Sequence, residues 1–276
     1  VFAQADAYLF AASSGTYVPI TGGTLITSST DGTPSLDSYG SGELTIPSFT
    51  FAGTAYTSMK VTSNGQIYFN LGTTTVPSST YTSLSSSTAS NILLAPFSAD
   101  LNQEATGVSE IRYQTVGNEI VVQWSNFRRY NLAEVFSFQA RLNTVTGVIK
   151  YVYMGTPPYA ASTSYQPQIG IKSSTTNYHY LTVSSTGLWN APVNSNTGIT
   201  SSSLCTFNGS VGFSTGLTYT FTPPVSCVGT PIGGKVSSVN QIVCSGSTPA
   251  AISVPFANPG FSGYTYQWEE SDDNGV

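Results

Sequence analysis

The sequence predicts an all-β protein whose main unit is an antiparallel β-sandwich of the jelly-roll type, followed by a partial immunoglobulin-like β domain. Aromatic residues make up 12% of the 276 residues, and aromatic and β-branched side chains favour strands. Short apolar or alternating runs recur along the chain with Gly, Asn and Pro between them, a pattern typical of antiparallel sandwiches. No window combines a helical period with capping residues.

A hairpin over residues 56–69 is the strongest local prediction. Two short β-type runs flank Asn64-Gly65, and this pair favours a type I′ turn because both central residues of that turn have positive φ. The apolar run at residues 92–97 is too short for a helix and indicates a buried strand that ends at Pro96. These two units form the centre of the predicted core.

The other strands are predicted in chain order from alternation and turn residues. Short strands are expected at residues 6–10 and 15–24, and residues 44–51 alternate between apolar and polar side chains. The later strands are a hairpin over 109–124 with its turn at Gly117-Asn118, and runs at 136–142, 148–153, 168–171, 178–183 and 216–222. Residues 72–90 form a Ser/Thr-rich loop, and a loop of this length is often functional or mobile.

The domain organisation follows from the ends of these patterns. Residues 1–5 match the tail of a signal peptide, with a first edge strand as the alternative. The sandwich covers residues 6–222, and a linker over 223–240 begins with two prolines. In residues 241–276, Cys244 is followed 24 residues later by Trp268, which is the rhythm of an immunoglobulin-like domain. The pattern stops within a hairpin, so we expect the natural protein to be longer.

Composition and charge exclude several classes of function. Charged residues make up only 8% of the chain, and the formal net charge is -5. An acidic chain lacks the basic face needed to bind nucleic acid or an anionic membrane surface. No run of 18 or more apolar residues is present, so no membrane insertion is expected. The abundance of neutral hydroxyl side chains suits a secreted or cell-surface protein.

The cysteines are Cys205, Cys227 and Cys244, and no CxxC spacing indicates a zinc site. In an exported protein, an odd number indicates one disulfide and a leftover thiol. We predict a disulfide between Cys205 and Cys227, which flank the last strand of the sandwich. Closing a loop of this size stabilises a protein by about 3 kcal/mol. The alternative joins Cys227 to Cys244.

Five short motifs occur in a characteristic order. They are V-T-S-N-G-Q-I-Y-F at residues 61–69, L-A-P-F-S-A-D at 94–100, I-R-Y at 111–113, V-Q-W-S-N-F at 122–127 and F-Q-A-R-L at 138–142. This order resembles the nidogen-type (NIDO-like) extracellular module. It also resembles the N-terminal domains of large Bacteroidetes surface proteins, which continue into immunoglobulin-like repeats. The resemblance covers residues 6–222.

The resemblance implies a role in adhesion or matrix assembly and supplies no catalytic residues. Proteins of this kind are commonly exported by the type IX system through a C-terminal signal. The expected partners are an extracellular protein or glycan, or further copies of the chain. The predicted function is therefore a non-enzymatic adhesion or recognition module at the N-terminal end of a longer protein. The alternatives are a self-assembling filament or sheath subunit and a carbohydrate-binding module, which would carry a flat row of exposed Tyr or Trp.

Two groups of residues are candidates for a binding site. Asp100, Asn102 and Glu104 alternate as oxygen ligands of calcium can; the alternative is that Asp100 is a hydrogen-bonded turn residue. No other cofactor is expected. The sequence Arg128-Arg129-Tyr130 can stack on a sugar or pair with an acidic partner; the alternative is an exposed loop paired with Glu134.

Catalytic chemistry is not favoured. His179 is the only histidine, no G-x-S-x-G elbow accompanies it, and it is interpreted as a strand-surface residue. A glycosidase needs two carboxylates at a set separation. The available glutamates all lie on ordinary strands or turns: Glu43, Glu104, Glu110, Glu119 and Glu134.

Overall fold

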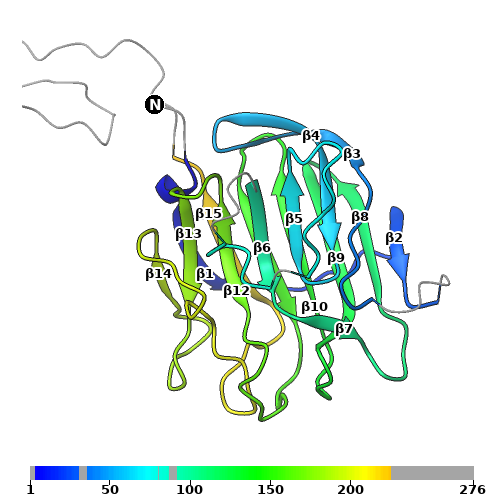
Figure 1. Cartoon of the computed structure of the whole chain (residues 1–276), viewed down its shortest axis with the longest axis vertical. Helices are drawn as coiled ribbons and strands as arrows, with labels where there is room; N and C mark the ends of the chain where they lie inside the picture. The colour runs from blue at the N-terminus through cyan, green and yellow to red at the C-terminus, as the bar shows by residue number, and fades with distance from the viewer. Residues whose placement is uncertain (1–3, 31–35, 80, 87–91, 225–276) are drawn as a thin grey trace, which may run out of the picture. The chain divides into compact units, whose positions relative to one another are not determined.

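The computed structural model describes residues 4–30, 36–79, 81–86 and 92–224. The chain divides into two compact units, Val1–Pro224 and Val225–Val276. The second unit holds most of the predicted linker and the predicted immunoglobulin-like segment, and it lies outside the described residues. The first unit is all-β, as predicted, apart from a short 3₁₀ turn, η1 (Ala5–Ala7). Its two antiparallel sheets form a sandwich (Figure 1).

We call the two layers sheet A and sheet B. Sheet A runs from edge to edge through β1 (Leu9–Ser14), β15 (Leu217–Thr222), β11 (Ile149–Met154), β10 (Phe136–Asn143), β9 (Glu119–Arg129), β8 (Glu110–Val116) and β2 (Thr24–Ser28). The short strand β7 (Leu101–Gln103) pairs with the end of β9. Sheet B runs through β14 (Val193–Ser195), β13 (Tyr178–Thr182), β12 (Gln168–Lys172), β6 (Ile92–Ser98), β5 (Gln66–Phe69), β4 (Thr54–Thr62) and β3 (Leu44–Phe51). Consecutive strands are mostly neighbours, so meanders build both sheets.

The hairpin at Asn64-Gly65 forms where the sequence predicts it, but with a different turn. Thr62 pairs with Gln66, and of the three loop residues only Gly65 has a positive φ, 72°. This is a three-residue hairpin ending in a left-handed residue, not a type I′ turn. Asn64 is fully buried; its side chain accepts a hydrogen bond from the Leu101 N–H at 2.6 Å and donates one to the Ser78 carbonyl at 2.5 Å. Asn64 therefore joins three segments of the chain.

Pro96 lies inside β6 and does not end it, which corrects the sequence prediction. The register between β6 and β12 shifts at this point, because Ser98 pairs with Gln168 whereas Ala95 pairs with Gly170. The extra residue forms a bulge, where a residue without a backbone N–H is tolerated. A proline also lies at a register shift in β3, whose pairing with β4 shifts across Pro47.

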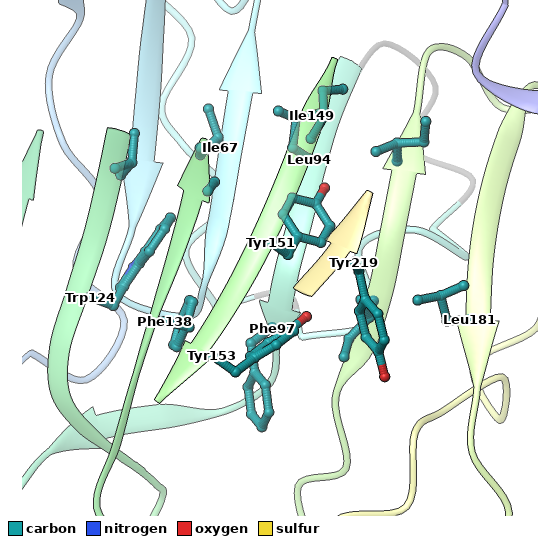
Figure 2. Close-up of a cluster of buried hydrophobic side chains, with 14 of the residues drawn as sticks. Ile67, Leu94, Phe97, Trp124, Phe138, Ile149, Tyr151, Tyr153, Leu181 and Tyr219 are labelled. Atoms are coloured by element: carbon teal, nitrogen blue, oxygen red, sulfur yellow. The ribbon is translucent and has the colours of Figure 1, made fainter. Parts of the chain in front are cut away.

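The core between the sheets is largely aromatic (Figure 2). The rings of Trp124 on β9 and Phe138 on β10 stack with centroids 4.8 Å apart. Buried aromatic residues of sheet A also donate hydrogen bonds to backbone carbonyls of sheet B, because a buried polar tip needs a partner. These bonds run from Trp124 to Thr62 at 2.8 Å, from Tyr151 to Gly170 at 2.8 Å and from Tyr153 to Pro96 at 2.7 Å.

The strand expected at residues 6–10 begins only at Leu9 and continues to Ser14, because residues 5–7 form η1. Two further parts of the predicted strand pattern differ from the structure. Residues 15–23 are not a strand, and β2 begins only at Thr24. The three-residue strands β7 and β14 were not predicted, because three residues are too few to establish an alternating pattern. The difference at residues 15–23 creates the surface described next.

Candidate functional site

Residues 15–23, which we call the outer strap, connect β1 with β2. These two strands are the opposite edges of sheet A (Figure 1). The strap therefore crosses the outer face of this sheet, the face turned away from the core. Tyr17 and Ile20 are each only 7% exposed, whereas the other strap residues are exposed. The strap is thus anchored on the sheet at two points.

Two glutamines hold the strap by its backbone. Side chains alternate along a strand, so Gln123 and Gln139 face outward while Trp124 and Phe138 fill the core. The Gln123 side chain accepts a hydrogen bond from the Ile20 N–H at 2.8 Å and donates one to the Ile20 carbonyl at 3.1 Å. Gln139 donates to the carbonyl of Val18 at 2.8 Å and to Gln123 at 2.7 Å. The two glutamines therefore provide hydrogen-bond partners for backbone groups of the strap, which is not paired with a strand of the sheet.

A charge cluster lies beside the strap on three neighbouring strands. The Glu119 carboxylate on β9 forms an ion pair with the Arg141 guanidinium on β10 at 3.0 Å, and it lies 3.6 Å from the Lys150 ammonium on β11. Arg141 also binds Gln139 and the Val18 carbonyl, so its donors are largely used. The Lys150 side chain is 42% exposed. With two cations around one carboxylate, the cluster carries one net positive charge on an acidic protein.

The strap, these charges and strands β1, β15, β11 and β10 enclose a groove of about 770 Å³. Known small-molecule sites measure about 300–1,000 Å³. Its lining is mixed, and apolar atoms supply the larger part of the exposed surface; the polar part comes from the hydroxyl groups of Ser13, Thr16, Thr21, Thr218 and Thr220 together with Gln114 and the charge cluster. Val18, Pro19, Val116 and Val152 supply apolar surface. A smaller hollow of about 320 Å³ lies near the β3–β4 turn. The groove on sheet A is therefore the candidate functional site.

The outer face of sheet B is covered instead. The described part of the predicted Ser/Thr-rich loop packs on this face, where Val76 and Leu84 join Tyr68, Leu93 and Tyr180 in a second apolar cluster. Long polar side chains of the sheet bind the backbone and side chains of the loop. These bonds include Lys60 to the Thr74 carbonyl at 2.9 Å, Gln66 to the Ser83 hydroxyl at 2.6 Å and Lys172 to the Ser86 carbonyl at 2.7 Å. Here the loop is part of the fold.

The structure separates the three predicted calcium ligands. The side-chain oxygen of Asn102 accepts a hydrogen bond from the Gln103 N–H at 2.8 Å. The Glu104 carboxylate lies against Gly107. Asp100 is only 8% exposed and lies beside Asp37 and Tyr81. No group of three or more His, Cys, Asp or Glu side chains converges on a metal position in the described part of the chain.

Arg128, Arg129 and Tyr130 do not form an exposed cationic patch. Arg129 is fully buried, is paired with Glu134 at 2.5 Å, and its guanidinium lies 4.9 Å from the centre of the Phe207 ring. It also donates to backbone carbonyls of residues 160–164. Arg128 donates to the carbonyls of Gln103 and Leu132. The pairing with Glu134 is present but buried, and an arginine without exposed surface cannot contact a partner.

Cys205 is a free, fully buried thiol. Its Sγ donates a hydrogen bond to the Leu181 carbonyl at 3.4 Å, and burial raises its pKa well above the ordinary value. The predicted disulfide from Cys205 to Cys227 is therefore not found in the structure. Cys227 and Cys244 lie outside the described residues.

His179 is buried, which corrects its interpretation as a strand-surface residue. It is 6% exposed, with Nδ1 at 3.0 Å from the Tyr8 carbonyl and Nε2 at 3.3 Å from Asn194 Oδ1. Burial lowers its pKa. Among the glutamates, Glu43 accepts a hydrogen bond from Ser58, and Glu110 pairs with Arg112. These groups serve separate structural contacts on different elements.

Sequence reasoning missed the groove. Its signal is present in β9 and β10, where Glu119, Gln123, Gln139 and Arg141 occupy outward positions between core residues. This pattern also describes any solvent-exposed sheet face. Only the path of the strap across this face turns it into a groove.

Two packed antiparallel sheets, with a groove under a strap on one outer face, define a β-sandwich module with a preformed surface site. The chain belongs to the NIDO-related family, since the family model described as NIDO related matches residues 7–223. Domains of this family are typically extracellular. No curated protein and no solved structure matches the chain. Within the described residues, no helix has the length and apolar character needed to span a membrane.

Proposed function

We propose that this NIDO-related domain is a non-catalytic adhesion or recognition module of a secreted or cell-surface protein, and that it binds an extracellular protein or glycan in the groove beside the outer strap. The observation that carries the proposal is the groove itself, with its hydroxyl lining and the half-exposed Lys150. Surfaces of this composition bind through many modest hydrogen bonds.

The scaffold favours binding because the site loses little conformational freedom on association. The groove floor consists of strands, and the strap is fixed by Gln123 and Gln139. A site that is rigid before binding avoids the entropic cost of ordering its side chains. The single net positive charge favours ligands that carry an acidic group, to which Lys150 can donate charge-assisted hydrogen bonds.

Two matched variants test the groove. Val18→Trp places an indole in the groove, whereas Val193→Trp makes the same change on β14 of the other sheet; the two valines are 56% and 68% exposed. Both proteins and the wild type are applied to glycan arrays and to immobilised extracellular-matrix proteins. We expect binding by the wild type and by Val193→Trp, and at least a tenfold loss for Val18→Trp. Lys150→Glu should weaken the same interaction.

Equal binding by the wild type, Val18→Trp and Lys150→Glu would place the ligand elsewhere. Hydrolysis of an arrayed glycan by the wild-type protein would contradict the non-catalytic assignment. Export by the type IX system is the route we propose from the family resemblance. A sorting signal at the end of the full reading frame is the observation that tests this route.

Self-assembly is a second candidate, favoured by one edge of the sandwich. Leu9 on β1 is 70% exposed, and Leu188 and Val193 near β14 are 64% and 68% exposed. β1 and β14 are edge strands of the two sheets, and Asn196 binds the backbone of Asp6 next to them. Exposed edges can pair with another chain. Light scattering would detect the oligomer, and Leu9→Lys should prevent its formation.

A sugar-stacking platform has less support. In the described part of the chain, Tyr165 is the one aromatic residue among the strongly exposed large apolar side chains, and its ring packs against Tyr130. A flat row of exposed Tyr or Trp is not found there. Glycan binding is therefore proposed through the hydroxyl and charged groups of the groove.

A further inference from the structure

Asp100 lies between β6 and β7, and a turn from a distant part of the chain is fixed next to it. The turn spans residues 36–39. Its Leu36 N–H donates to the Gln103 side chain at 2.8 Å, and its Tyr39 N–H donates to the Ser63 hydroxyl at 2.9 Å. These bonds anchor both ends of the turn on segments that flank Asp100. The turn carries Asp37, so two carboxylates are brought together from positions 63 residues apart in the sequence.

Tyr81 approaches the same position from the Ser/Thr-rich loop. Its carbonyl accepts a hydrogen bond from the Ser98 hydroxyl at 2.7 Å, two residues before Asp100. Its phenol lies close to the Asp100 carboxylate and to Ser38. The hydroxyl of Ser38 lies 3.5 Å from the Asp37 carboxylate. The side chains of Asp37, Ser38, Tyr81 and Asp100 therefore lie in one neighbourhood.

The Asp100 carboxylate is not neutralised by its described surroundings. The side chain is more than nine-tenths buried, and its Oδ1 atom has no hydrogen-bond partner among the described residues. No ion pair of Asp100 is present in that part of the chain. Burial and the charge of Asp37 raise the pKa of Asp100 to about 6. A buried oxygen without a partner and a second carboxylate beside it are both unfavourable.

We propose that Asp37 and Asp100 bind a hard divalent cation such as calcium, with water completing the coordination shell. Calcium takes oxygen ligands in flexible geometries, and a site with few carboxylates binds weakly. Two carboxylates predict a dissociation constant on the order of 0.1–1 mM, the range of extracellular modules. The cation would supply the missing partner of Oδ1 and cancel the repulsion between the two acids.

This site revises the grouping suggested by the sequence. Asp100 remains a ligand, but Asp37 takes the place of Asn102 and Glu104, which are directed to other groups. The site lies away from the groove residues, so it does not depend on the proposed function. The cation would join the turn at residues 36–39 to the β6–β7 connection and would stabilise both.

The test uses the full chain, stripped of metal with a chelator and titrated with calcium chloride, with sodium chloride at equal ionic strength as reference. We expect the midpoint of thermal unfolding to rise by about 3–5 °C at 10 mM calcium. Calorimetric titration should give one site. Asp100→Asn and Asp37→Asn should each remove the shift, whereas Glu104→Gln should retain it.

The variants distinguish the possible results. No calcium-dependent shift in the folded wild-type protein would overturn the proposal and leave Asp100 as a buried acid without a bound cation. Loss of the shift in Glu104→Gln but not in Asp37→Asn would also overturn it, in favour of the ligands grouped by sequence. Asp37→Asn changes a half-buried turn residue, so it provides a folded test even if Asp100→Asn is unstable.

Discussion

Gly65 shows how a single residue can be required by two independent constraints. Its φ of 72° lies in the left-handed region, and a Cβ atom there would clash with the carbonyl oxygen of Phe97 on the neighbouring strand β6. Gly117 in the β8–β9 turn has a similar φ of 58°, but a Cβ atom there would meet no atom within 4 Å. The two glycines separate the cost of backbone strain from the cost of a clash.

Gly65→Ala should lower the free energy of unfolding by about 2–5 kcal/mol, because strain and overpacking add. Gly117→Ala should cost about 1 kcal/mol from strain alone. Urea denaturation of both variants measures the difference. Equal losses would mean that the backbone of β6 moves aside without cost.

The buried ion pair of Arg129 and Glu134 is a second residue-scale feature with a structural role. Arg129 contacts carbonyls of Ala160, Ser162 and Ser164 and so holds the segment between β11 and β12. Removing one partner of such a pair leaves an uncompensated buried charge, whereas replacing both is often tolerated. The sequence shows both residues but not their burial, because arginines are usually exposed.

At the scale of elements, the outer strap is the feature that most affects the candidate site. It crosses sheet A without joining the ladder, so its backbone depends on side chains of the sheet. Gln123 binds both backbone groups of Ile20. If this bond fixes the strap, its loss should loosen the strap while the sheets beneath it remain intact.

Gln123→Leu should remove both hydrogen bonds and leave the two Ile20 groups without partners. We expect the free energy of unfolding to fall by about 2–4 kcal/mol, since each unsatisfied buried group costs about 1–3 kcal/mol. Hydrogen exchange should accelerate at residues 15–23. The matched variant Gln114→Leu on β8 should leave the exchange of Ile20 unchanged. Retained protection in Gln123→Leu would show that Tyr17 and Ile20 hold the strap by packing alone.

At the scale of the whole molecule, the pH dependence of stability reflects the titratable groups that the sandwich buries. His179 is one such group, and it faces Tyr8 and the charge of Asp6 from the N-terminal segment and Asn194 from β14. Its pKa is lowered in the folded state, chiefly by burial. Between the ordinary imidazole value of about 6.5 and this lower value, the unfolded chain binds a proton that the folded chain does not.

The wild-type protein should therefore lose stability as the pH falls below about 7 through this window. His179→Gln lacks the titrating group, and its unfolding midpoint should decline less between pH 7 and pH 5. Subtracting the unfolding midpoints of the two proteins at each pH cancels the contributions of all other titrating groups. Thermal unfolding at several pH values measures it. Parallel curves for the two proteins would show that His179 titrates alike in both states.

The sequence by itself determined the strands, the hairpins and the face of each strand that fills the core. This is possible because alternation and turn chemistry are local: β3–β6, β8–β13 and β15 follow patterns only a few residues long. The order of the family motifs likewise identified the NIDO-related family before the fold was known.

Tertiary structure decided which polar residues matter. The groove, the burial of Arg129, the free thiol of Cys205 and the approach of Asp37 to Asp100 all arise where distant segments meet. A glutamine such as Gln123 looks the same in sequence whether it faces water or holds a strap. Its role is set by which segment crosses above it, and a local pattern does not contain that information.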